Sequence, residues 1–163
     1  MAGTDRCAMR REFPAQQVRH CDPRERCQLV IEALLAAMIA LAPDEPVERL
    51  RAVATAIASA TESPIEAAVL VTISLYETNF ERAGIPFGLF SWRHRMRGQP
   101  LEVCASAALR MYRFTQRCGD DVATRLGWYH TGHCAPDSFS RREARTVGVV
   151  RTALEHDHVR ARR

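Results

Sequence analysis

The sequence predicts a mainly α-helical fold of five to six helices, interrupted by one long loop. Two observations carry this prediction. Apolar residues recur at helical spacing in several segments, and Ser-x-x-Glu pairs, which are typical of helix N-termini, occur at 63–66 and 140–143. Hydrophobic residues make up 47% of the 163 positions, which is enough for a core and argues against disorder.

Residues 1–42 are expected to form an N-terminal extension, and residues 43–160 the folded domain. The extension starts with a polar, arginine-rich segment. One interpretation is that this segment is disordered. The apolar stretch 28–42 is either a helix or an export segment, because it ends in Ala-Leu-Ala like a signal-peptide cleavage site but contains Glu32. No membrane span is expected, since the stretch is shorter than the roughly 20 apolar residues that a span needs.

Two helices are expected before the long loop. The first begins after Pro46, where apolar side chains fall at helical spacing. The second covers residues 64–80. Ser63 suits its N-cap, Pro64 its first position and Glu66 the third position of a capping box.

Glu77 lies near the end of this second, strongly apolar helix. It shares a helix face with Ile73 and Phe80, so it extends the buried face. Apolar surroundings and the negative end of the helix dipole both favour a protonated carboxyl, and a carboxyl that keeps its proton can act as a general acid. We therefore expect Glu77 to be the functional acid, the alternative being a helix-end acid without a catalytic role.

The remaining chain predicts a loop and three further helices. Residues 81–99 contain three glycines and a proline and are expected to form a loop with at most a short hairpin. Helices are expected at 100–117 and 120–132, each followed or closed by a glycine. The last helix is expected to open with a capping box formed by Ser140 and Glu143.

Three short motifs follow one another along the chain. They are "LVTISLYETNF" at 70–80, "GLF" at 88–90 and "YHTG" at 129–132. In the order of these motifs and in their positions relative to the predicted helices, the chain resembles the lysozyme-like domain of soluble lytic transglycosylases and related wall hydrolases over about residues 45–155. That family has a catalytic Glu at a helix end, then a Gly-Leu-Met/Phe-Gln-like turn, then a Tyr-Asn-Ala-Gly-like helix end.

The resemblance implies an α+β lysozyme-like fold with a reduced β region, and cleavage of the β-1,4 bond between N-acetylmuramic acid and N-acetylglucosamine in peptidoglycan. Glu77 would act as acid and then as base, toward water or toward the sugar's own 6-hydroxyl. The second route needs no other protein carboxylate and makes a lytic transglycosylase the expected class. No cofactor or metal is implied, and a monomer is expected. The resemblance assigns substrate binding to Gly88, Leu89, Phe90, Ser91, Tyr129 and Thr131.

The chain departs from the family pattern in three features. Ser91 stands where Gln is usual, His130 stands where Asn is common, and the loop from Glu77 to Gly88 is shorter than usual. These departures affect cleft depth and substrate grip, and they leave a catalytically silent glycan-binding or structural domain as the alternative. A nucleic-acid partner is not expected, because the arginines are interspersed with acids along the chain instead of forming one basic face.

Six cysteines suit disulfides in an exported protein, and a periplasmic or extracellular location is expected, although no clear signal peptide is present. Cys104 and Cys118 lie on one predicted helix about 21 Å apart, so they cannot form a bridge with each other. Cys134 could pair with either. The alternative is a zinc site formed by Cys118, His130, His133 and Cys134, but their spacing matches no common zinc motif.

Overall fold

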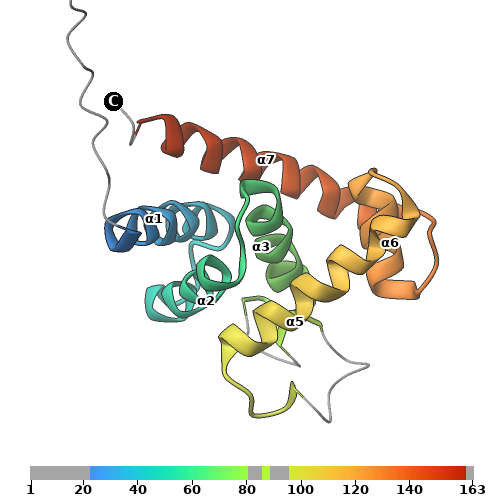
Figure 1. Ribbon diagram of the computed structural model, residues 1–163, viewed down its shortest axis with the longest axis horizontal. Helices are drawn as coiled ribbons and strands as arrows, with labels where there is room; N and C mark the ends of the chain where they lie inside the picture. Colours follow the sequence, from blue (N-terminus) through green and yellow to red (C-terminus); the bar gives the residue numbers. More distant parts are fainter. Residues whose placement is uncertain (1–22, 81–85, 89–95, 161–163) are drawn as a thin grey trace, which may run out of the picture.

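A computed structural model describes residues 23–80, 86–88 and 96–160, with side chains over 28–80, 87–88 and 96–156. Its helices form a bundle (Figure 1), and no strand occurs in the described ranges, so the mainly α prediction is confirmed. A reduced β region was expected after Glu77, and residues 81–85 and 89–95, which follow Glu77, lie outside these ranges. The elements are α1 (Pro23–Leu41), α2 (Val47–Ala60), α3 (Pro64–Thr78), η1 (Pro86–Gly88), α5 (Leu101–Phe114), η3 (Thr115–Cys118), α6 (Val122–Thr131) and α7 (Ser138–Arg160).

The core is built around α3, which lies among the other helices in Figure 1 and contacts α1, α2, α5 and α7. Every residue from 67 to 74 is buried. A helix that is apolar on all sides is stable only when it is surrounded by other elements. The continuous apolar run of this helix therefore explains its central place and fixes the position of the residues at its C-terminal end.

Local capping sets both ends of α3. The Ser63 hydroxyl accepts a hydrogen bond from the Glu66 amide at 3.4 Å, as predicted, whereas the Glu66 carboxylate accepts from the amide of Glu62 and not from that of Ser63. The helix ends at Thr78, two residues earlier than predicted, because Asn79 and Phe80 adopt left-handed φ values of 48° and 51°. The chain therefore turns away after Thr78, one residue beyond Glu77.

The structure differs from the predicted domain boundary at residue 43. The apolar stretch 28–42 forms most of α1, which packs against α2 and α7. Leu34, Leu35 and Met38 belong to the same buried core as α3. Their burial explains the apolar character that also suggested an export segment. Among the helices described, none has the length and apolar character needed to cross a membrane.

A disulfide joins the segments on either side of α6. Cys118 and Cys134 form this bond with their Cα atoms 5.2 Å apart, which is one of the pairings left open by the sequence. Because both sulfurs are bonded to each other, they are not available as ligands for the alternative zinc site. The Cys104 thiol is buried and donates to the Met96 carbonyl at 3.8 Å. The other three cysteines lie outside the described side chains.

The predicted capping box at the start of α7 is wrong. The structure pairs Ser140 with Asp137: the Ser140 amide donates to Asp137 Oδ1 at 2.7 Å, and the Asp137 amide donates to Ser140 Oγ at 3.0 Å. Asp137 is three residues before Ser140, and it accepts from the Ser140 amide in the place of Glu143. Glu143 is thereby released from a capping role, and its side chain points into the protein.

Candidate functional site

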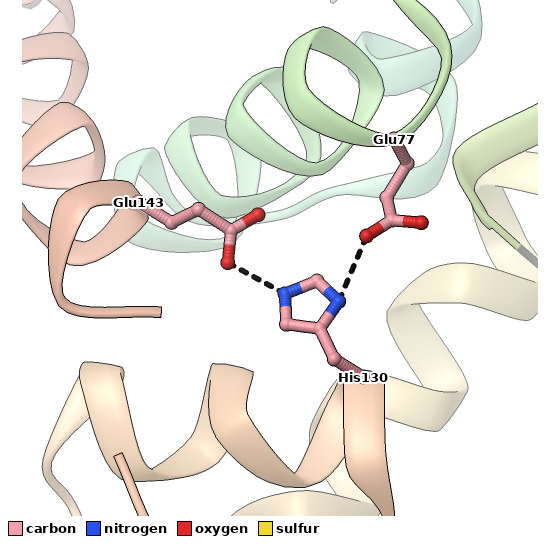
Figure 2. Close-up of side chains that lie close together, drawn as sticks. All are labelled: Glu77, His130 and Glu143. Atoms are coloured by element: carbon pink, nitrogen blue, oxygen red, sulfur yellow. Dashed lines mark hydrogen bonds and ion pairs between the residues drawn. The ribbon is translucent and has the colours of Figure 1, made fainter. Parts of the chain in front are cut away.

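Three titratable side chains from three helices meet at one end of α3 (Figure 2). Glu77 comes from the last turn of α3, His130 from α6 and Glu143 from α7. His130 Nδ1 lies 2.8 Å from Glu77 Oε1, and His130 Nε2 lies 2.6 Å from Glu143 Oε2. One imidazole ring therefore bridges two carboxylates, with one nitrogen directed at each.

Solvent exposure increases along this chain of contacts. The Glu143 side chain is fully buried, whereas the His130 and Glu77 side chains are 12% and 15% exposed. Glu143 Oε1 is buried and has no hydrogen-bond partner within the described residues. A buried carboxylate needs compensation for the water it has lost, and here only the His130 ring supplies it among the side chains described.

The two carboxylates decide the charge of the ring. Burial alone would lower the pKa of His130, but the hydrogen bonds and charges of Glu143 and Glu77 outweigh burial and raise this pKa from 6.5 to about 9. Burial raises the pKa of Glu143, although the His130 ring opposes that shift. The raised pKa of His130 means that the ring keeps its proton in the folded site. At neutral pH the His130 ring is an imidazolium that donates from both nitrogens.

Gly88 brings the backbone of η1 against Glu77. A Cβ atom at this position would lie 2.6 Å from both Cγ and Oε2 of Glu77, closer than real side-chain contacts allow. The φ value of +65° also favours glycine. The Tyr129 hydroxyl donates to the carbonyl of the preceding Phe87 at 2.7 Å, which ties η1 to α6. Gly88 of the second motif therefore lies against Glu77 of the first motif, and Tyr129 of the third motif binds the residue that precedes Gly88.

The structure brings together three of the predicted site residues, namely Glu77, Gly88 and Tyr129. Thr131 is exposed at the end of α6, where its hydroxyl donates to the Gly127 carbonyl and accepts from the amide of His133. Its described bonds therefore serve the helix end. Leu89, Phe90 and Ser91 lie outside the described residues.

Sequence reasoning missed His130 and Glu143 as members of the site. His130 was interpreted as a departure from the family's Asn or as a ligand of the alternative zinc site, and Glu143 as half of a capping box. A signal for Glu143 was present, because it lies four residues before Val147, seven before Val150 and eleven before Leu154, which are all buried. Spacing of this kind places Glu143 on the core-facing side of α7.

Aromatic rings surround the imidazole. Phe139 and Tyr129 lie edge-on to the His130 ring, with centroids 5.0 Å and 5.8 Å away. Tyr76 packs on Phe139, and its hydroxyl lies 3.1 Å from the Thr146 hydroxyl. Only 12% of the His130 side chain is exposed, and low exposure to water strengthens its contacts with both carboxylates.

The arrangement favours proton sharing over metal binding. Glu77, His130 and Glu143 each offer one ligand atom, and these atoms lie within 4.8 Å of one another. However, the imidazole stands between the carboxylates and directs a different nitrogen at each, so the groups do not converge on one point as the ligands of a single ion do.

In comparisons with protein-family models, curated proteins and solved structures, the chain matches none. The function of the chain therefore has to be inferred from the chemistry of this site and from the order of its motifs.

Proposed function

We propose that this protein cleaves the β-1,4 bond between N-acetylmuramic acid and N-acetylglucosamine in peptidoglycan, as a lytic transglycosylase with Glu77 as the single acid and base. The domain would be lysozyme-like, and its substrate would lie outside the cytoplasm. A periplasmic or extracellular location agrees with the Cys118–Cys134 disulfide.

The observation that carries this proposal is the convergence of three separated motifs on one carboxylate. Glu77 ends α3, Gly88 lies against its carboxyl group, and Tyr129 holds the backbone next to Gly88. Three motifs that are separated in the sequence thus lie together in the fold, and this supports the proposed resemblance to lytic transglycosylases. Chance similarity of short motifs gives no reason for them to meet in space.

A single-acid mechanism is supported by the surroundings of Glu143. Retaining glycosidases have two carboxyl groups about 5–5.5 Å apart, and both must reach the substrate. Glu143 is close to Glu77, but it is fully buried behind the His130 ring. It cannot contact a glycan strand, so it does not serve as the second carboxylate.

In the proposed reaction, the Glu77 carboxyl gives its proton to the glycosidic oxygen as the bond to the muramic acid carbon breaks. The resulting carboxylate then takes the proton from the sugar's 6-hydroxyl, whose oxygen bonds to the same carbon. A 1,6-anhydro ring forms, and Glu77 is protonated again. Neither a second carboxylate nor an attacking water is needed.

A catalytically silent glycan-binding or structural domain is the second candidate. It is favoured by one observation, namely that Glu77 is only 15% exposed and is engaged by His130 at 2.8 Å. A carboxylate held in this way can serve a purely structural ion pair.

Release of soluble muropeptides from purified peptidoglycan separates the two candidates. We expect release by the wild-type protein, and a loss of at least about a hundredfold in the Glu77→Gln variant, because Gln keeps the size of the side chain but cannot transfer the proton. Glu155→Gln is the matched control, since Glu155 is an exposed residue of α7 that contacts Arg151. Equal release by the wild type and Glu77→Gln would refute the role of Glu77, and no release by a folded wild type would favour the silent domain.

A further inference from the structure

We propose that Glu143 is a positioning residue that acts on Glu77 through His130: the buried carboxylate holds the Nε2 proton of the ring and thereby presents the Nδ1 proton to Glu77. The proposal rests on the proposed function, since it concerns how the reacting carboxyl of that function is supplied with a proton. Glu143 does not contact the substrate in this scheme.

The geometry assigns this role to Glu143 and not to a neighbouring group. Its Oε2 is 2.6 Å from His130 Nε2, which is the shorter of the two contacts that the ring makes. Its other oxygen, Oε1, has no competing donor among the described residues. The orientation of the ring between α3 and α7 is therefore set from the α7 side, by a carboxylate that solvent does not reach.

The hydrogen bond made by one ring nitrogen of an imidazole determines the protonation of the other ring nitrogen. With Nε2–H bound to Glu143, the imidazolium has its second proton on Nδ1, directed at Glu77 Oε1 at 2.8 Å. Transfer of this proton breaks the N–H bond and forms an O–H bond on Glu77. The products are a neutral ring that still donates Nε2–H to Glu143, and a protonated Glu77. The reverse transfer restores the ion pair, and the total charge of the three groups does not change.

The other groups around the ring do not offer the same interaction. Asp137, which precedes α7, is exposed, and its carboxylate accepts from the Ser140 amide at the helix end. Tyr129 and Phe139 present ring edges, and the Arg142 cation stacks over Phe139 and Tyr76. Within the described part of the chain, Glu77 and Glu143 are thus the two carboxylates that bind His130.

The test is an NMR pH titration of the His130 ring in the substrate-free protein. In the wild type, we expect the ring to remain protonated past pH 8 and to titrate near its raised pKa of about 9. In Glu143→Gln, the midpoint should fall by roughly one pH unit or more, because the negative charge is lost while burial remains. Glu155→Gln is the matched control, since it removes a carboxylate from an exposed position of the same helix.

Two results would overturn the proposal: a wild-type ring that titrates near 6.5, which needs no variant, or a folded Glu143→Gln variant with an unchanged midpoint. A second readout is the pH dependence of muropeptide release. Glu143→Gln should lower kcat by at least about tenfold with little change in KM, and should shift the alkaline loss of activity to lower pH. A merely structural role would lower the amount of folded enzyme and leave the shape of the pH profile unchanged.

The titration separates this proposal from the proposed function, because it needs no substrate. A wild type that releases no muropeptides but shows the expected titration would refute the function and leave the role of Glu143 toward His130 intact. A wild type that releases muropeptides but shows an unshifted pKa for His130 would support the function and refute the role of Glu143 toward His130.

Discussion

His130 is the residue that joins the interior of the protein to its candidate acid. Its ring contacts Glu143 on the buried side and Glu77 on the more exposed side. The sequence identifies Glu77 from its place at the end of an apolar helix, but a buried imidazole between two carboxylates cannot be recognised without knowing how α6 and α7 pack. Such a network is strong only when all of its members are present.

The charge of His130 predicts a pH-dependent stability. The pKa of the ring is raised from 6.5 to about 9 in the folded protein, so its contribution is fully present below pH 6.5 and is lost as the pH rises through about 9. The contribution corresponds to roughly 3 kcal/mol at most. The free energy of unfolding of the wild type, measured by urea denaturation, should be clearly lower at pH 9.5 than at pH 6. For His130→Gln this difference should be much smaller. An equal pH dependence of the free energy of unfolding in the two proteins would contradict the assignment of this effect to His130.

Gly88 predicts a second effect at the residue scale. Gly88→Ala introduces a Cβ atom 2.6 Å from the Glu77 side chain at a φ value of +65°. We expect a loss of roughly 1–3 kcal/mol in the free energy of unfolding and reduced muropeptide release, because Glu77 must move. Gly148→Ala is the matched control, since a Cβ atom there meets nothing within 4 Å and lies inside α7. Its stability should be unchanged or slightly higher, and equal effects of both substitutions would refute the close approach.

At the scale of elements, most helices could be predicted from periodicity and end signals. Ser63 and Pro64 place the start of α3. The helix predicted at 120–132 is α6 (Val122–Thr131), which is capped by Asp121 and Gly132. The start of α7 shows why the rest could not be predicted. Asp137 and Glu143 are both at the spacing of a cap partner for Ser140, and only tertiary burial decides that Glu143 turns inward.

The Asp137 cap can be tested separately from the buried site. Asp137→Ala removes the acceptor of the Ser140 amide and should lower the free energy of unfolding, because the first turn of α7 loses its cap. Ser138→Ala, an exposed substitution at the first residue of α7, should change it by less than Asp137→Ala does. Chemical denaturation of both variants measures the difference, and a neutral Asp137→Ala would show that Ser140 and Asp137 do not cap the helix.

At the scale of the whole molecule, α1 is part of the core that supports α3. The sequence could not distinguish a core helix from an export segment over 28–42, because both are apolar and of similar length. The structure places Leu34, Leu35 and Met38 in contact with the remaining core. The support of Glu77 therefore begins upstream of the predicted domain boundary.

Substitutions in α1 test its contribution to the core. Met38 is fully buried, whereas Leu29 on the same helix is 50% exposed. Met38→Ala should lower the free energy of unfolding by about 2–5 kcal/mol, and Leu29→Ala by well under 1 kcal/mol. Thermal or urea unfolding of the two variants gives the comparison. If Met38→Ala were as mild as Leu29→Ala, α1 would not belong to the cooperative core.

The mass of the sugar ends released from peptidoglycan is the decisive measurement for the proposed chemistry. A single acid that returns its proton through the sugar's own 6-hydroxyl predicts muropeptides with 1,6-anhydro ends, lighter by one water than hydrolysis products. Wild type and Glu77→Gln would be compared by mass spectrometry under identical conditions. Anhydro ends from the wild type alone are the expected result. Fully hydrated ends would contradict the single-carboxylate mechanism, since water would then be the attacking group.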